Sequence, residues 1–321
     1  MSVPFHDLHA VSITPFDERG EIDEDGLRRH LTRLVAAGVV PYLAGSGSGE
    51  ANGLSPVERT RIFEIARDTL GPNAPLRYAA FEPRTLGDLF RAIEDVRPYR
   101  PDAVRLTVPD LGHGHVATAT EAETFLRDAL GELTALSVPV SLAIGSESVR
   151  STPPAVLVEA LLRDHANIVS LELGTADPSI LLSYLGIAGT RPVLVPSAGH
   201  FLSGLALGVS GGFGPLMNLL PNTHRRLLTS FRKGDLRGVE DDYRTIVAVQ
   251  GLLRPYGTVI PIKAALSAFG LPAGEPRRPR LALGAAETRA IVAGLIALGV
   301  PEAEGWQDTT GDIHEHRALA G

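Results

Sequence analysis

The chain has 321 residues, a formal net charge of −7 at pH 7 and no cysteine. Hydrophobic residues make up 44% and charged residues 21%, a composition that supports a large buried core. The lack of cysteine excludes disulfides and cysteine-ligated zinc, and the acidic balance argues against nucleic acid or membrane as a partner. No signal peptide and no apolar run of about 20 residues is visible, so we expect a cytoplasmic protein.

Short apolar runs alternate with longer amphipathic segments along the chain. The short runs predict eight strands, at residues 10–14, 39–44, 77–81, 103–108, 138–144, 168–173, 192–196 and 211–216. Helical periodicity lies between them, for example at 23–37, 55–70, 85–96 and 120–136. The second of these helices begins with a predicted capping box, Ser55-Pro56 with Glu58. This alternation favours an α/β fold, a closed (β/α)8 TIM barrel, over a doubly wound sheet.

The segment after the eighth strand predicts three further helices, at 222–250, 258–269 and 285–298. A barrel with eight helices does not need all of them. We therefore expect residues 1–221 to hold the barrel strands and most helices. Residues 222–300 would add the final barrel helix and a C-terminal helical region, and residues 301–321 a tail.

Several motifs, in order from about residue 12 to residue 300, resemble the dihydrodipicolinate synthase and N-acetylneuraminate lyase family. They are Ile13-Thr14-Pro15-Phe16, the glycine loop Gly45 to Glu50, Leu54-Ser55 with Glu58-Arg59, Asn167-Ile168-Val169, Ala206-Leu207-Gly208 and Lys263-Ala264-Ala265-Leu266. The resemblance implies a TIM barrel and a lyase that acts on a small oxo- or hydroxy-acid. It also implies a homodimer or homotetramer. We expect no cofactor.

The family's catalytic positions hold other residues in this chain. The family's strand six ends in a lysine that forms an imine with a keto substrate, and Glu172 stands at the matching position. The family's strand five ends in a tyrosine and an asparagine, and the matching residues are Ala143 and Ile144. The chain has two lysines, Lys233 and Lys263, both in predicted helices. Because a carboxylate cannot form an imine, the sequence predicts acid–base catalysis without a Schiff base.

Functional groups of a TIM barrel gather at the carboxyl ends of the strands. Carboxylate and imidazole groups there suit proton transfer near neutral pH. We expect catalytic roles for Glu172, His113, His115, His200 and Asp110. Exposed N–H groups of a glycine loop can hold a carboxylate. Substrate-binding roles are therefore expected for Gly47, Ser48, Glu50, Glu82 and Arg150.

Structural alternatives exist for five of these residues. His113 and His115 could lie in a polar surface loop. Glu172 could pair with an arginine such as Arg105, His200 could cap the following helix, and Glu50 could tie down the glycine loop. No metal ligands are assigned, because a His-x-His pair is a weak signal without further ligands. A divalent metal held by His113 and His115 with a carboxylate or His200 is the alternative.

Three hypotheses for the function remain. The first is a lyase-type enzyme that catalyses aldol cleavage, dehydration or cyclisation of a small oxo- or hydroxy-acid. The second is a non-catalytic barrel that binds a metabolite or a partner, and the third is a metal-dependent aldolase.

Overall fold

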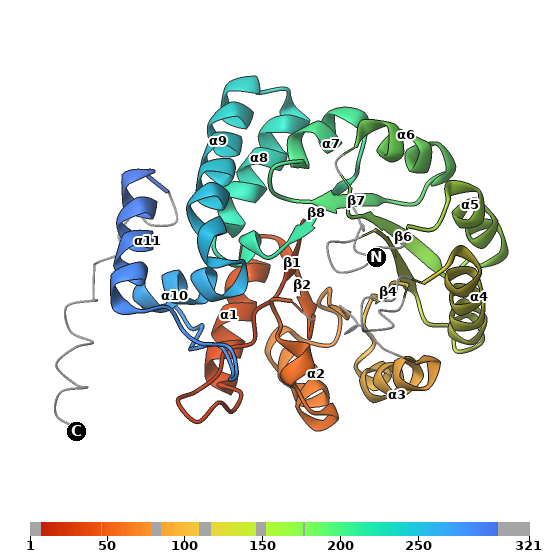
Figure 1. The fold of residues 1–321 in the computed structure, drawn as a ribbon, viewed down its shortest axis with the longest axis horizontal. Coiled ribbons are helices and arrows are strands. Elements are labelled where there is room, and N and C mark those ends of the chain that lie inside the picture. The colour runs from red at the N-terminus through yellow and green to blue at the C-terminus, as the bar shows by residue number, and fades with distance from the viewer. Residues whose placement is uncertain are drawn as a thin grey trace.

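The computed structural model describes residues 8–45, 47–78, 85–108, 117–145, 152–175 and 177–300. Eight parallel strands close into a barrel in the order in which they occur along the chain, and the eighth pairs with the first (Figure 1). They are β1 (Leu8–Val11), β2 (Val39–Leu43), β3 (Arg77–Tyr78), β4 (Ala103–Leu106), β5 (Val140–Ile144), β6 (Ile168–Leu173), β7 (Val193–Pro196) and β8 (Gly211–Gly214). The expected TIM barrel is confirmed.

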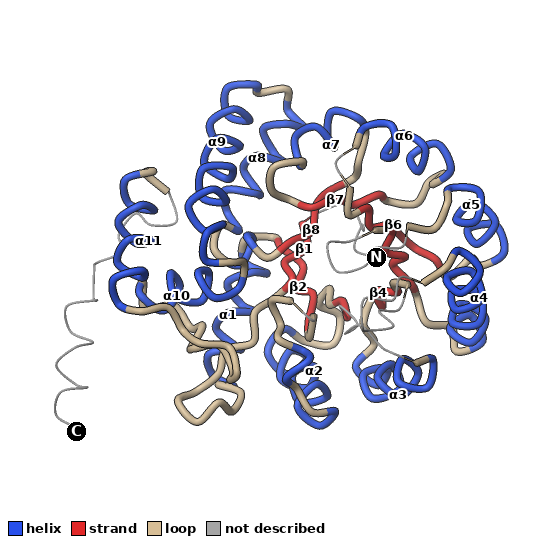
Figure 2. The backbone as a smooth tube through the Cα atoms, viewed as in Figure 1, coloured by secondary structure: helices blue, strands red, loops and turns tan. Residues whose placement is uncertain are grey.

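Helices form a ring around the strands, as Figure 2 shows. They are α1 (Glu24–Ala36), α2 (Pro56–Leu70), α3 (Leu86–Val96), α4 (Ala119–Ala135), α5 (Ala155–Asp164), α6 (Pro178–Ile187), α7 (Phe201–Leu207) and α8 (Pro221–Lys233). Short 3-10 helices occur at Ala51–Gly53, Arg97–Tyr99, Leu216–Asn218 and Arg254–Tyr256. The capping box at the start of α2 is confirmed, because Ser55 and Glu58 each bond the other's backbone N–H. Within the described ranges, no helix is long and apolar enough to cross a membrane.

Three further helices gather at one side of the barrel, beside α8 (Figure 1). They are α9 (Leu236–Leu253), α10 (Val259–Ala268) and α11 (Ala285–Ala297). The expectation of a single helix at 222–250 is wrong, because α8 ends at Lys233 and α9 begins at Leu236. Gly234 adopts a φ of +73° and ends the first helix, and the Asp235 side chain accepts from the N–H of Gly238 and begins the second.

The strand ends differ from the predicted ones by a few residues. β1 lies earlier than the predicted strand at 10–14, and β4 and β8 end before residues 108 and 216. After β1, the Ser12 N–H still donates to the Tyr42 carbonyl of β2 at 2.8 Å, and Thr14 Oγ1 donates to the Gly49 carbonyl at 2.8 Å.

The two faces of the barrel strands differ in polarity. Alternate residues of a strand point to opposite faces. The outward set is apolar and packs in the main core, for example Leu8, Val104, Leu142 and Leu171. The inward-facing residues of neighbouring strands are paired in register. The pairs are His9 with Val40, Tyr42 with Arg77, Arg105 with Ser141, and Ser141 with Ser170. TIM barrels usually fill this space with branched apolar residues, so a polar interior on β1 to β6 points to function.

The loop after β1 contacts the segment after α10 through a bridge between Phe16 and Gly274. Gly274 has a φ of +62°, and a Cβ there would lie 1.9 Å from the Phe16 carbonyl oxygen. Gly270 has nearly the same φ, +68°, but open space around its Cβ position. The two glycines therefore separate backbone conformation from steric contact.

We expect Gly274→Ala to lower the free energy of unfolding by about 2–5 kcal/mol. The left-handed conformation accounts for about 1–2 kcal/mol, and overpacking adds about 1–3 kcal/mol. Gly270→Ala should show the first part alone. Urea denaturation of both variants checks this, and equal losses would show that the loop after β1 moves away at no cost.

Candidate functional site

Glu172 lies on β6 and points into the barrel, with a side chain that is 0% exposed. Its Oε1 accepts hydrogen bonds from the Tyr42 hydroxyl and from Ser141 Oγ, the latter at 2.6 Å. Its Oε2 accepts from Arg105 Nε at 2.9 Å. Both carboxylate oxygens therefore have partners, and the pair with Arg105 is present.

A second set of donors supports these contacts. Arg77 Nη1 donates to the Tyr42 hydroxyl at 2.6 Å, and Ser170 Oγ donates to Ser141 Oγ at 2.7 Å. Burial raises the pKa of Tyr42 well above its usual range, and this outweighs the opposite effect of Arg77. The phenol thus stays protonated and remains a donor to Glu172.

His9 extends the polar interior to β1. The centroids of its ring and the Tyr42 ring lie 5.3 Å apart. Burial, followed by the positive charge of Arg77, lowers the pKa of His9 well below its usual value, so the imidazole is neutral. Among the described residues, neither of its ring nitrogens has a hydrogen-bond partner.

The glycine loop follows β2 and is built on close backbone contacts. A Cβ at Gly49 would lie 2.6 Å from the Gly45 nitrogen, so this turn requires glycine. Arg280 Nη1 donates to the Gly47 carbonyl at 3.3 Å, and Ser48 is buried. The predicted substrate-binding pair Gly47-Ser48 thus belongs to a tightly folded loop.

Glu50 ends this loop in a left-handed conformation, with a φ of +53°. Its Oε1 lies 2.6 Å from Lys263 Nζ, and both side chains are buried. The Arg277 N–H donates to Oε2 at 3.0 Å. These contacts connect Glu50 to α10 and to the segment after it.

Lys263 is buried on α10, and its Nζ also donates to the Glu275 carbonyl at 3.1 Å. The same nitrogen lies 4.4 Å from the centre of the Phe16 ring. Burial lowers the pKa of Lys263 to about 8, against the opposing effect of Glu50. The amine is therefore still largely protonated at neutral pH and forms an ion pair.

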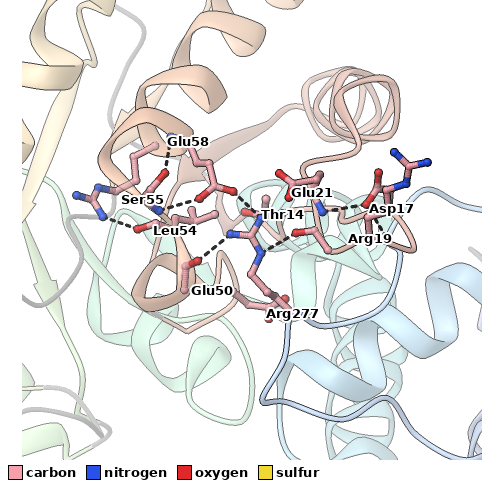
Figure 3. A network of polar contacts seen from close by, with 12 residues as sticks. Thr14, Asp17, Arg19, Glu21, Glu50, Leu54, Ser55, Glu58 and Arg277 are labelled. Atoms are coloured by element: carbon pink, nitrogen blue, oxygen red, sulfur yellow. Dashed lines mark hydrogen bonds and ion pairs between the residues drawn. The ribbon is translucent and has the colours of Figure 1, made fainter.

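Arg277 joins the loops after β1 and β2, as Figure 3 shows. Its Nε donates to the Gly20 carbonyl at 2.8 Å, and Nη1 donates to the Gly53 carbonyl at 2.8 Å. Its Nη2 forms an ion pair with Glu58. One arginine from the C-terminal part of the chain therefore fixes both loops.

His200 stands at the N-cap position of α7, and its ring is exposed. Its carbonyl accepts from Gly204 N–H and Ser203 Oγ, and its side chain does not cap the helix. The remaining predicted site residues lie outside the described residues: Asp110, His113, His115, Glu82 and Arg150. In the part of the chain that the structure describes, no group of three or more His, Asp or Glu side chains could hold a metal ion.

Three residues of this network were not predicted from the sequence: Tyr42 on β2 and Ser141 on β5, which bond to Glu172, and Arg77 on β3, which bonds to Tyr42. A signal was present, because each is a polar residue in a short strand whose neighbours are apolar. In a barrel covered by helices, such a residue must point into the interior.

Comparisons with known proteins agree with this architecture. Residues 4–79 and 161–297, more than half of the chain, match the model of the dihydrodipicolinate synthetase family. The chain belongs to the dihydrodipicolinate synthetase family. This is a family of lyases that act on small keto acids and are typically oligomeric.

Relatives cover most of the chain at low identity. A 4-hydroxy-tetrahydrodipicolinate synthase of Corynebacterium aurimucosum is 28% identical over 310 residues, which cover 92% of this chain and 95% of the relative. A probable 5-dehydro-4-deoxyglucarate dehydratase of Methylobacterium radiotolerans is 27% identical over 296 residues, with coverages of 89% and 93%. The crystal structure of a dihydrodipicolinate synthase from Bacillus anthracis has a TM-score of 0.82 at 19% identity, covering 92% of this chain and 99% of that one.

The family match leaves out residues 80–160. Two of the partners of Glu172, Arg105 and Ser141, lie in that stretch. The surroundings of Glu172 thus combine strands inside the matched segments with strands outside them.

Proposed function

We propose that this protein is a lyase-type enzyme that acts on a small oxo- or hydroxy-acid by acid–base catalysis, without an imine to lysine. The observation that carries the proposal is the set of contacts around Glu172. This carboxylate stands where the sequence resemblance places the family's lysine, and Tyr42, Ser141 and Arg105 bond to it. The names of the two sequence relatives support an oxo-acid substrate and carbon–carbon or carbon–oxygen chemistry.

The positions of the two lysines support a mechanism without an imine. Lys233 is the last residue of α8 and is exposed on the outer ring of helices. Lys263 is buried on α10, and its amine is held by Glu50 and Glu275. Neither lysine belongs to a barrel strand, and a protonated amine in an ion pair is not a nucleophile.

The proposed chemistry begins with removal of a proton beside a carbonyl group. Glu172 takes the proton as general base, and the guanidinium of Arg105 stabilises the negative charge that develops on the substrate. Aldol cleavage, dehydration and cyclisation share this enolate-type step. The Gly47-Ser48 loop is proposed to contact the substrate, together with Glu82 and Arg150, and Asp110, His113, His115 and His200 to assist the proton transfers.

Solvent deuterium exchange tests the proposal even though the exact substrate and the later steps of the reaction are not known. Pyruvate, 2-oxobutyrate and related oxo acids are incubated with the protein in D2O, and exchange beside the carbonyl is followed by NMR. We expect exchange with at least one acid. We also expect that borohydride neither inactivates the protein nor leaves an adduct visible by mass spectrometry. An adduct on Lys233 or Lys263 would contradict the imine-free mechanism.

A second candidate function is binding without catalysis. It is favoured by the complete burial of the Glu172 side chain and by the partners that both its oxygens already have. In that case an oxo acid would bind in calorimetry but would show no exchange in D2O.

A further inference from the structure

We propose that Arg105 binds the carboxylate of the substrate and that Glu172 positions its guanidinium. This inference deepens the proposed function, on which its choice of an oxo acid as ligand rests. The sequence resemblance implies relatives that hold their substrate covalently, through an imine. In this protein an ion pair between Arg105 on β4 and the substrate would hold it instead.

The ion pair is unevenly exposed. The Arg105 side chain is 15% exposed, whereas the Glu172 side chain is 0% exposed. All of the solvent contact of the pair therefore belongs to the arginine. A ligand that arrives from solvent therefore reaches the Arg105 side chain before it reaches the Glu172 carboxylate.

The Arg105 guanidinium is held in one orientation by Glu172. Nε of Arg105 donates to Oε2 of Glu172 at 2.9 Å. The other oxygen of that carboxylate is fixed by Tyr42 from β2 and Ser141 from β5. Guanidinium is planar and carries five N–H donors, so fixing Nε also fixes the directions of the two Nη groups. These two groups suit the two oxygens of a carboxylate.

The charges of the interior also favour an anion. Counted over the described residues on β1 to β6 that face inward, two guanidiniums, Arg77 and Arg105, stand against the single carboxylate of Glu172. His9 adds no charge, because its imidazole is neutral. In a poorly solvated site the attraction between Arg105 and a bound carboxylate is strong.

The test pairs a variant of the protein with a change in the ligand. Wild-type and Arg105→Gln proteins are titrated with pyruvate and with pyruvamide, which replaces the carboxylate by an uncharged amide. We expect the wild-type to bind the acid 10- to 100-fold more tightly than the amide. We expect Arg105→Gln to lose that preference, a coupling of about 1.4–2.8 kcal/mol.

Two further variants separate anchoring from a structural role. Arg244→Gln breaks an exposed arginine–glutamate pair with Glu240 on α9 and should leave the acid preference unchanged. Glu172→Gln keeps Arg105 but removes the carboxylate that orients it. If Glu172 positions the guanidinium, the acid-to-amide preference falls in part even though this change removes a negative charge from the interior; an unchanged or larger preference removes the positioning role. Circular dichroism confirms that each variant is folded before titration.

The proposal is overturned if the wild-type binds the acid no better than the amide. It is also overturned if Arg105→Gln weakens binding of both ligands by the same factor. Deuterium exchange separates this outcome from that of the proposed function. If the wild-type protein prefers the acid but shows no deuterium exchange, Arg105 binds the carboxylate and the proposed enzymatic function is wrong. If the protein catalyses exchange and Arg105→Gln keeps the full preference for the acid, the enzymatic function stands and Arg105 does not bind the carboxylate.

Discussion

Replacing Lys263 by methionine is expected to lower the free energy of unfolding by about 3–5 kcal/mol, because one partner of a buried ion pair is removed. The amine lies 2.6 Å from Oε1 of Glu50, and the two side chains are 0% and 3% exposed. Without the lysine, the carboxylate would keep the Arg277 N–H at 3.0 Å and a more distant Arg280 at 3.7 Å. Neither replaces a cation in direct contact. Chemical denaturation followed by circular dichroism measures the loss.

Two comparisons make this prediction specific to the ion pair. Lys233→Met changes the other lysine, which is exposed at the end of α8, and should cost less than about 0.5 kcal/mol. The double variant Lys263→Met with Glu50→Gln removes both charges and should recover part of the stability, since the loss comes mainly from the unpaired carboxylate. Equal stabilities of Lys263→Met and Lys233→Met would show that Glu50 finds another partner.

Replacing Glu172 by glutamine is expected to reduce the rate of deuterium exchange and of turnover by about 10²- to 10⁴-fold, the usual contribution of a general acid–base group. Glutamine has nearly the same shape, but it neither accepts a proton as a base nor forms an ion pair with Arg105. The measurement is the exchange rate at saturating oxo acid, which separates chemistry from binding. Some loss of stability is expected as well, because Arg105 keeps its charge.

The matched control for this variant is Glu240→Gln. Glu240 also pairs with an arginine, Arg244 at 2.6 Å, but on the exposed face of α9. It should exchange at the wild-type rate. Undiminished exchange in a folded Glu172→Gln protein would remove Glu172 from the reaction and leave it as the partner of Arg105 alone.

The fold could be predicted because its signals are local. Each strand is a short apolar run, and the start of α2 carries its own capping residues, Ser55 and Glu58. The prediction of one helix at 222–250 was wrong for a local reason too. The helical periodicity continues across Gly234 and Asp235, and a single glycine inside a helical pattern is tolerated often enough to be overlooked.

The site could be predicted only in part, because its contacts are not local. Glu172 was found through a resemblance, and Arg105 as an arginine available to pair with it. Tyr42 comes from 130 positions earlier in the chain than Glu172. Its place on the inner face depends on the register between β1 and β3, which apolar periodicity alone does not give.

The contacts of Arg277 and Lys263 also have a consequence for the order in which the protein is made. Arg277 bonds to Gly20 across 257 positions and to Glu50 across 227. A ribosome therefore releases all eight strands before it delivers the side chains that hold the first two loops. A nascent chain that stops before residue 263 would contain the whole barrel sheet, yet it would lack Lys263, Arg277 and Arg280, which contact the carboxylate of Glu50 among the described residues. Assembly of this end of the protein thus waits for the last part of translation.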